Sequence, residues 1–429
     1  MVTFALPSLN LRRLTRALLA VCLFNACSPA EESATPPQPP PADEAEHAAK
    51  LNESEAARLM ALGYVEVVSD EDDTGQDGAS EIDPARTAPG LNFSVNAHLC
   101  SADLIDAKGT LLRRWSHEPC LKWSNAVLRP DGRVLVIHRA PGKTSSGSFL
   151  ARQVLHLDWE GNALWNTPIA AHHDLDVLPD GRIAVLTYRH RPIPSLHPTV
   201  PVRDNYVALL SPEGELLEEV SLIDILAASP KASPFRAVRA RKHEGSMEVD
   251  LIHANSIEWM RRPELAQQDP LYAESNFLLC SRSQNTVTIV DWETKRVVWS
   301  WGQGVLSGPH DATVLEDGNI LIFDNGLNRR HSRVLEVDPR TDEIVWSYPA
   351  SDAESFFTSH RGAAQRLSNG NTLITNSGAG VAFEVTPAGE TVWEYRNPNR
   401  SEAGDRVILV RTRRVEPVDL AKPELRWSD

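Results

Sequence analysis

Residues 125–165 read NAVLRPDGRVLVIHRAPGKTSSGSFLARQVLHLDWEGNALW, and this stretch decides the fold. Two apolar runs flank Asp131-Gly132, and two more surround Glu160-Gly161 before the stretch ends at Trp165. Asp-Gly between apolar runs is the strongest short signal for a β-hairpin, because both turn residues adopt positive φ. The stretch therefore predicts four antiparallel strands in one unit.

The same unit recurs along the chain, with glycine in its tight turns. Copies cover residues 173–220, 310–348 and 361–395, and a longer copy at about 253–301 lacks the first glycine turn. Four strands in a repeat of about 40 to 50 residues are the mark of a β-propeller blade. The repeat therefore indicates an all-β propeller in which five blades can be recognised directly.

A sixth blade is divided between the two ends of the repeat region. Residues 95–115 supply its later strands, and residues 405–415 supply the missing strand. A shared blade closes the ring and removes exposed sheet edges. We therefore predict an all-β, six-bladed β-propeller whose ring is closed by N- and C-terminal segments that share a blade. A seven-bladed ring with a further blade in 190–250 and an open β-solenoid are the alternatives.

Tryptophan recurs at one position of the unit, in its last strand. Because the recurrence follows the structural repeat, we predict that these rings pack between blades rather than stack on a ligand. The set is Trp115, Trp165, Trp299, Trp346 and Trp393.

Residues 1–27 are typical of an export signal. An apolar run too short to span a bilayer follows Arg16 and ends in Ala26-Cys27. This ending resembles a bacterial lipoprotein signal, in which the cysteine becomes the lipidated N-terminus. Cys22 is a second candidate, and an ordinary cleaved signal with an incidental cysteine is the alternative. All these readings place the mature chain outside the cytoplasm, in the periplasm or cell envelope, with a lipid at Cys27 as its expected membrane contact.

Charge and composition divide the rest of the chain. Residues 28–90 hold 15 acidic and 3 basic residues and a proline-rich run, so we predict a linker with a short helix near 52–63. The propeller is predicted over 91–416 and a tail over 417–429. The net charge of −15 argues against a nucleic-acid partner, which requires a basic face.

The cysteines beyond the signal indicate a structural role. Cys100 and Cys120 lie on neighbouring segments, and an oxidising compartment would allow a disulfide between them. Cys280 lies in an apolar run and is predicted to be buried. No Cys-x-x-Cys motif occurs in the sequence, which argues against a thiolate zinc site.

Histidine recurs where the first strand of several units begins. Because the first strand of a propeller blade lines the central channel, we expect these imidazoles to converge at one mouth. Such a group suits a metal ion, or acid–base and nucleophilic chemistry on an anion. The four are His173, His253, His310 and His360.

Two residues near these histidines favour an anion over a metal ion as the bound group. Asn255 lies two residues from His253, on the same side of its strand. Arg282 is on the next strand of that unit, and a guanidinium repels a bound cation and attracts an oxyanion. The sequence therefore predicts an anion site that holds no metal.

These residues resemble the motifs of a known family. The resemblance is to the bacterial arylsulfotransferases and covers about residues 91–415. It implies an exported six-bladed propeller that needs no cofactor and transfers a sulfuryl group between phenols through a sulfohistidine, with ping-pong kinetics and no nucleotide sulfate donor. The matching elements are His253-Ala254-Asn255-Ser256, Ser281-Arg282, His310-Asp311-Ala312, Phe323-Asp324-Asn325-Gly326 and Arg329-Arg330.

Matched residue by residue, the resemblance makes His310 the nucleophile and His253 a second catalytic histidine. Arg282 falls on the family's site arginine. His173 falls on the first site histidine, with His172 as a near alternative. The expected partners are small aryl sulfates and phenols.

Other positions are less defined by the resemblance. Asn255 is expected to bind sulfuryl oxygens, and His360 is assigned to substrate binding without a role carried over. The chain departs from the family at Asp311, which replaces a smaller polar residue and is expected to raise the basicity of His310. It also departs in its short spacing of 28 residues between Arg282 and His310.

Two rival functions differ in what they require. A non-catalytic propeller that serves as a binding or assembly platform at the cell envelope would not need His310 and Arg282 together. A metal- or quinone-dependent propeller enzyme would need cofactor contacts that the sequence does not show.

Overall fold

The computed structural model describes residues 76–143, 149–243, 246–349, 357–401 and 404–415. The chain divides into two compact units, 1–52 and 53–429, and every described residue belongs to the second. The predicted export signal with Cys27, the helix near 52–63 and the tail over 417–429 lie outside the described residues. No helix among the described residues is long and apolar enough to cross a membrane.

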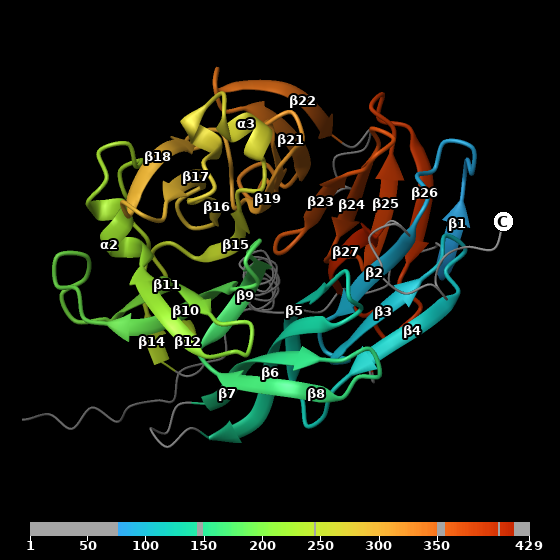
Figure 1. Ribbon diagram of the computed structural model, residues 1–429, viewed down its shortest axis with the longest axis horizontal. Coiled ribbons are helices and arrows are strands. Elements are labelled where there is room, and N and C mark those ends of the chain that lie inside the picture. Colours follow the sequence, from blue (N-terminus) through green and yellow to red (C-terminus); the bar gives the residue numbers. More distant parts are fainter. Residues whose placement is uncertain (1–75, 144–148, 244–245, 350–356, 402–403, 416–429) are drawn as a thin grey trace, which may run out of the picture. The chain divides into compact units, whose positions relative to one another are not determined.

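The second unit is a six-bladed β-propeller, as the sequence predicts (Figure 1). Each blade is an antiparallel sheet, and the blades follow one another around the ring in sequence order. The alternating apolar pattern supplies strands that are buried on both faces, because each sheet packs between two others.

The strands are given blade by blade, starting from the channel. Blade 1 holds β27 (Leu409–Val415), β2 (Leu91–Asn96), β3 (Ser101–Ile105) and β4 (Leu111–Ser116). Blade 2 holds β5 (Lys122–Leu128), β6 (Val134–Lys143), β7 (Phe149–Leu157) and β8 (Ala163–Pro168). Blade 3 holds β9 (Ala171–Val177), β10 (Ile183–Arg191), β11 (Val202–Leu210) and β12 (Leu216–Ser221).

The remaining blades keep this order. Blade 4 holds β15 (Ala254–Trp259), β16 (Asn276–Ser281), β17 (Thr286–Asp291) and β18 (Arg296–Trp301). Blade 5 holds β19 (His310–Val314), β20 (Ile320–Asp324), β21 (Arg333–Asp338) and β22 (Glu343–Pro349). Blade 6 holds β23 (Ala363–Arg366), β24 (Thr372–Asn376), β25 (Val381–Val385), β26 (Thr391–Arg396) and β1 (Gly78–Glu81).

The ring closes in blade 1, where both ends of the repeat region meet. β27 pairs antiparallel with β2, from Leu91 opposite Val415 to Asn96 opposite Leu409. Figure 1 shows the red β27 beside the blue β2. The predicted closure is therefore confirmed, although the strand begins at Leu409 rather than at Val407.

β1 is an addition that the sequence did not reveal. It lies within the stretch predicted to be linker and pairs with β26, so that Gly78 opposes Arg396 and Glu81 opposes Trp393. This fifth strand covers the outer edge of blade 6.

Residues 190–250 do not form a seventh blade. The described residues of this segment complete β10 and form β11 and β12. They continue into helix α2 (Leu222–Ala227) and a hairpin of β13 (Arg241–His243) and β14 (Ser246–Glu248). Helix α3 (Pro263–Ala266) and a 3-10 turn at Pro270–Tyr272 follow β15. The seven-bladed and solenoid alternatives are therefore excluded.

The recurring tryptophans join neighbouring blades, as predicted. Their indole N–H groups donate to backbone or side-chain oxygens in the blade that follows: Trp165 to Pro212, Trp299 to Asp342, Trp346 to Pro387 and Trp393 to Ala107. Trp115 is fully buried and packs edge-on against Trp159 of blade 2. The repeat of these residues is therefore structural.

The cysteines of the propeller are structural as well. Cys100 and Cys120 form a disulfide between the end of the β2–β3 turn and the loop before β5. Cys280 is buried in β16.

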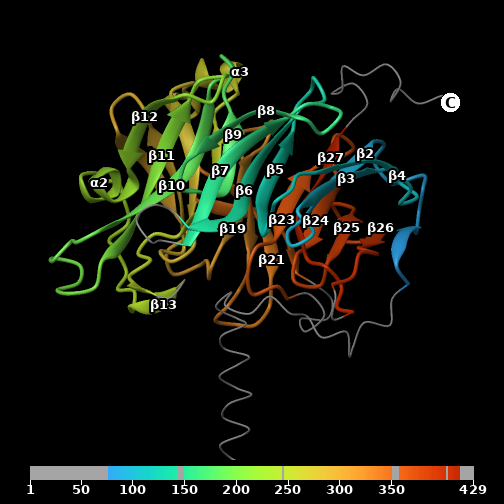
Figure 2. The ribbon, with the colours of Figure 1, turned by 90° about the horizontal axis from the view of Figure 1, so that it is seen from below.

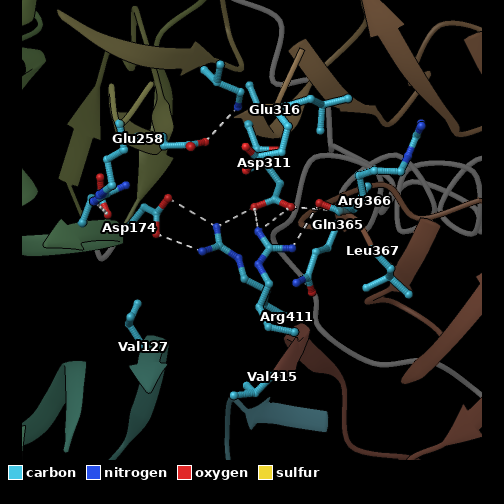
Figure 3. Close-up of a pocket in the computed structure, with 18 of the residues that line it drawn as sticks. Val127, Asp174, Glu258, Asp311, Glu316, Gln365, Arg366, Leu367, Arg411 and Val415 are labelled. Carbon is cyan, nitrogen blue, oxygen red and sulfur yellow. Dashed lines mark hydrogen bonds and ion pairs between the residues drawn. The ribbon is translucent and has the colours of Figure 1, made fainter. Parts of the chain in front are cut away.

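The inner strands run side by side in one direction through the ring and carry an ion cluster between them. Arg411 of β27 reaches across the channel and bonds Asp174 of β9 at 3.1 Å and Asp311 of β19 at 2.8 Å (Figure 3). Arg413 adds a second bond to Asp311, at 2.7 Å. The cluster joins blades 1, 3 and 5 at the centre of the ring.

Electrostatics explain why these charges are paired. Burial raises the pKa of Asp174 above its usual value in spite of Arg411. Burial also acts to raise the pKa of Asp311, but Arg411 and Arg413 outweigh it and lower the pKa of that carboxyl. Each buried charge therefore depends on its partner, since an unpaired charge in the interior is strongly unfavourable.

We predict that Arg411→Met destabilises the propeller by about 3 to 5 kcal/mol, because it leaves two buried carboxylates without their shared cation. Denaturant unfolding at pH 7 measures the loss. Arg340→Met is the matched control, since Arg340 pairs with Asp338 at the surface and such pairs contribute at most about 1 kcal/mol. Equal stability losses in the two variants would contradict the role given to Arg411.

Candidate active site

Hydrogen bonds between inner strands establish which residues of the blades are equivalent. Blades 4, 5 and 6 repeat one bond, in which a backbone amide donates to a side chain of the preceding inner strand: Ile257 to Asp174, Ala312 to Ser256 and Ala364 to Asp311. The three acceptors therefore occupy one level of the channel.

The histidines occupy two levels, and the expectation of one shared position is wrong. His173 and His310 directly precede the acceptor level, as Asn255 does. His253 and His360 are a further two residues upstream. The two sets differ because His253 and His360 precede strands β15 and β23, whereas His310 opens β19 and His173 lies inside β9, and sequence spacing does not give these strand starts.

His173 and His253 face each other in spite of their different levels. Their ring centroids are 4.8 Å apart and the rings meet edge to face. Both residues have positive φ, 57° and 51°, a conformation that is uncommon outside glycine and concentrates at functional sites.

His172, the alternative to His173, belongs to the blade rather than the channel. Its Nε2–H donates to the carbonyl of Thr187 at 3.1 Å, and its Nδ1 lies 2.7 Å from Nδ1 of His173. Since His172 Nδ1 is then the acceptor, His173 carries its proton on Nδ1 and keeps a lone pair on Nε2. His172 thus orients His173.

His310 opens β19 and is held in one tautomer. Its Nδ1–H donates to Asn325 Oδ1 at 2.6 Å and approaches the carbonyl of Gly308 at 3.1 Å. Its Nε2 accepts a long bond from the amide of Arg361, at 3.2 Å. The lone pair that a nucleophile needs is therefore on Nε2.

Arg282 lies beside His310 and His253. It is 8% exposed, its backbone amide donates to the carbonyl of His253, and its Nη2 reaches the carbonyl of Ser359 at 3.4 Å. Its positive charge lowers the pKa of both imidazoles. The structure thus brings together the arginine and two histidines that the sequence predicts.

The imidazoles of the cluster are neutral at pH 7. Burial is the main cause, and it lowers the pKa of His253 to about 4. Burial also holds the pKa values of His173 and His310 well below 6.5, with His253 and Arg282 respectively as the next causes. A neutral imidazole beside a fixed cation suits nucleophilic attack on an anion better than it suits cation binding.

Asn255 has a different contact from the one expected. Its Nδ2–H donates to the carbonyl of Pro309 at 2.8 Å, which fixes the loop before His310. Its buried Oδ1 has no hydrogen-bond partner among the described residues. In this structure Asn255 therefore positions the strand that begins at His310.

His360 lies near the cluster and bonds outside it. Its Nδ1 is 3.1 Å from the hydroxyl of Ser359, and the ring is half-buried. The segment that carries His360 contacts the site through its neighbours, since Ser359 meets Arg282 and Arg361 meets His310.

Asp311 does not act on His310 as expected. Its carboxylate turns to the other side of the strand and is bonded by Arg411, Arg413 and the amide of Ala364. The prediction that Asp311 raises the basicity of His310 is therefore wrong, because adjacent residues of a strand point to opposite sides.

The family model of the arylsulfotransferases (ASST) matches residues 136–398, which is more than half of the chain. The chain belongs to the arylsulfotransferase family. Membership supports an arylsulfotransferase activity in general terms, and the resemblance noted in the motifs is confirmed. No curated protein matches the sequence.

Three solved structures are similar to this arylsulfotransferase family member at low identity, and one of them reaches a TM-score of 0.50. A protein of unknown function from Bacteroides caccae has a TM-score of 0.50 and 13% identity, covering 76% of this chain and 98% of its own. A streptogramin B lyase has a TM-score of 0.42 and 13% identity, covering 76% and 89%. Virginiamycin B lyase from Staphylococcus aureus has a TM-score of 0.42 and 13% identity, covering 75% and 88%.

The structure adds site residues that sequence reasoning missed. Asn325 fixes the tautomer of His310 and also donates to the carbonyls of Thr358 and Arg361. The sequence contained a signal for Asn325, because this residue belongs to the Phe-Asp-Asn-Gly motif on which the family resemblance rests. Arg411 had no such signal, since its role depends on a contact between distant blades.

A cavity of about 800 Å³ lies beyond the ion cluster, at the ends of the inner strands (Figure 3). Among its lining residues are Val127, Glu258 and Val415, and burial raises the pKa of Glu258 to about 7. Asp174 and Asp311 also line it, so the cluster separates this cavity from the histidines. None of the predicted site residues is among the described residues that line it.

Proposed function

We propose that the chain transfers a sulfuryl group from a phenolic sulfate ester to a second phenol, through a sulfohistidine on His310. The observation that carries the proposal is the arrangement of His310, whose Nε2 lone pair is fixed by Asn325 and lies near the cation of Arg282. Such an imidazole is a competent nucleophile at pH 7.

In the first half-reaction, Nε2 of His310 attacks the sulfur of the ester, and the bond from sulfur to the aryl oxygen breaks. The long bond from the Arg361 amide must yield as the new N–S bond forms. The imidazole ring keeps its proton on Nδ1 and donates it to Asn325 Oδ1, so that the positive charge of the adduct is partly dispersed. The aryl oxide then leaves.

His253 supplies and recovers the proton that phenol exchange requires. The bound sulfate ester brings a negative charge to the site, which favours the imidazolium form of His253. That imidazolium protonates the leaving aryl oxide. In the second half-reaction, neutral His253 takes the proton from the acceptor phenol, whose oxygen attacks sulfur while the N–S bond to His310 breaks.

Arg282 supports the transfer by its charge. Sulfuryl oxygens carry negative charge throughout the reaction, and a guanidinium placed before the substrate arrives needs no reorganisation to stabilise it. The second N–H of Asn255 is available for the same oxygens, since one N–H is bonded to Pro309.

We propose that this reaction takes place outside the cytoplasm, with the chain anchored through a lipid at Cys27. The export signal motivates the proposal, and the Cys100–Cys120 disulfide is of the kind that forms in oxidising compartments. The intact mass of the mature protein tests it, because an N-terminus other than a lipidated Cys27 would exclude the anchor.

We predict that His310→Ala abolishes both release of 4-nitrophenol from 4-nitrophenyl sulfate and transfer to an acceptor phenol, because no N–S intermediate can form. Release with and without acceptor is followed by absorbance. His98→Ala is the matched control, since His98 is exposed and distant in sequence from the site. Native-rate exchange by the His310→Ala protein would exclude His310 as the nucleophile.

We predict that kcat/KM for 4-nitrophenyl sulfate stays level as the pH falls from 7 to 5.5. The pKa of His310 lies well below 6.5 because of burial and Arg282, so the nucleophile remains neutral over this range. An imidazole with the ordinary pKa near 6.5 would lose about tenfold in rate by pH 5.5. An acid limb centred near pH 6.5 in the measured profile would contradict this account of the site.

A further inference from the structure

We propose that Asp250 is the positioning residue that aims the proton of His253 at the aryl oxygen of the substrate. The inference rests on the proposed function and extends it to a residue outside the family motifs. It is carried by a buried carboxylate placed behind the second catalytic histidine.

The geometry is that of an orienting pair. Asp250 Oδ2 accepts the Nδ1–H of His253 at 2.6 Å, and Asp250 is 2% exposed. With Nδ1 committed to the carboxylate, the other ring nitrogen of His253 is left for exchange with the substrate. The opposite tautomer would present no acceptor nitrogen to the phenol in the second half-reaction.

The backbone is shaped to allow this contact. Asp250 and His253 are only three positions apart, and the positive φ of His253, 51°, accompanies the turn between them. A non-glycine residue in this conformation costs roughly 1 kcal/mol or more. The surroundings therefore hold the turn in this conformation. The bond to Asp250 is the shortest hydrogen bond that His253 makes.

Asp250 is itself held by the insertion between blades 3 and 4. Arg241 of β13 donates to Asp250 and also pairs with Glu248 of β14, at 3.3 Å. Val249 joins the inserted segment to β11 through a backbone bond from Arg203. Figure 2 shows β13 on one face of the propeller and α3 on the other, so the hairpin lies at the histidine end of the channel.

The charge of Asp250 opposes the effects that keep His253 neutral. Burial lowers the pKa of His253 to about 4, while Asp250 raises it and Arg282 and Arg241 lower it. Without the carboxylate, the imidazolium that protonates the leaving oxygen would be less accessible. The proton balance of the reaction is unchanged: His253 gives its proton to the first aryl oxide and takes one back from the acceptor phenol.

The test compares Asp250→Asn with wild type on two donors. Phenyl sulfate has a poor leaving group that needs the proton, whereas 4-nitrophenyl sulfate releases a stable phenolate without it. We expect kcat for phenyl sulfate to fall by roughly 10 to 100-fold, the scale on which orienting partners of histidines act. The rate for 4-nitrophenyl sulfate should change by less than about threefold, and KM should be retained.

Asp291→Asn makes the same chemical change in blade 4, at a turn residue bonded to Thr294, and should leave both rates unchanged. Asp250→Asn combined with His253→Gln should be no slower on phenyl sulfate than His253→Gln alone, because the two residues act as one unit. An Asp250→Asn protein that does not fold, or that loses both rates equally, would assign Asp250 a structural role and overturn the proposal. Wild-type protein that cleaves neither donor would instead refute the proposed function.

Discussion

The ion cluster of Arg411 with Asp174 and Asp311 is the constraint on which the rest of the propeller depends. It joins the C-terminal strand to blades 3 and 5 in the channel, where water is largely excluded and each charge needs its partner. Asp174 directly follows His173 and Asp311 directly follows His310. The ion cluster therefore fixes two strands at the residues next to the site.

Three imidazoles of the candidate site each have their tautomer set by a neighbour of a different kind. Asn325 accepts the Nδ1–H of His310, His172 accepts that of His173, and Asp250 accepts that of His253. The neutral amide suits a nucleophile that must remain uncharged, and the carboxylate suits a residue that must carry a proton. The three partners are thus consistent with the different roles proposed for these similar side chains.

The sequence predicted the fold well because a propeller repeats its signals. Glycine turns and tryptophans return in most units, and the closure at β27 follows from the incomplete first unit. The site was predicted less completely, because His253 and His360 lie before their strands rather than inside them, and because Asp311 points to the side of its strand away from His310. Arg411 acts between distant blades, which no local pattern records, and β1 lies in a stretch whose composition indicates linker.

The measurement that tests the central claim most directly is tandem mass spectrometry of the protein quenched during turnover with an aryl sulfate alone. Peptides are compared with those of protein that has received no donor, under conditions that preserve N–S bonds. The account predicts one added sulfuryl group, on His310, which disappears when an acceptor phenol is added before quenching. A sulfuryl group found instead on His173 or His253, or turnover with no labelled histidine, would contradict it.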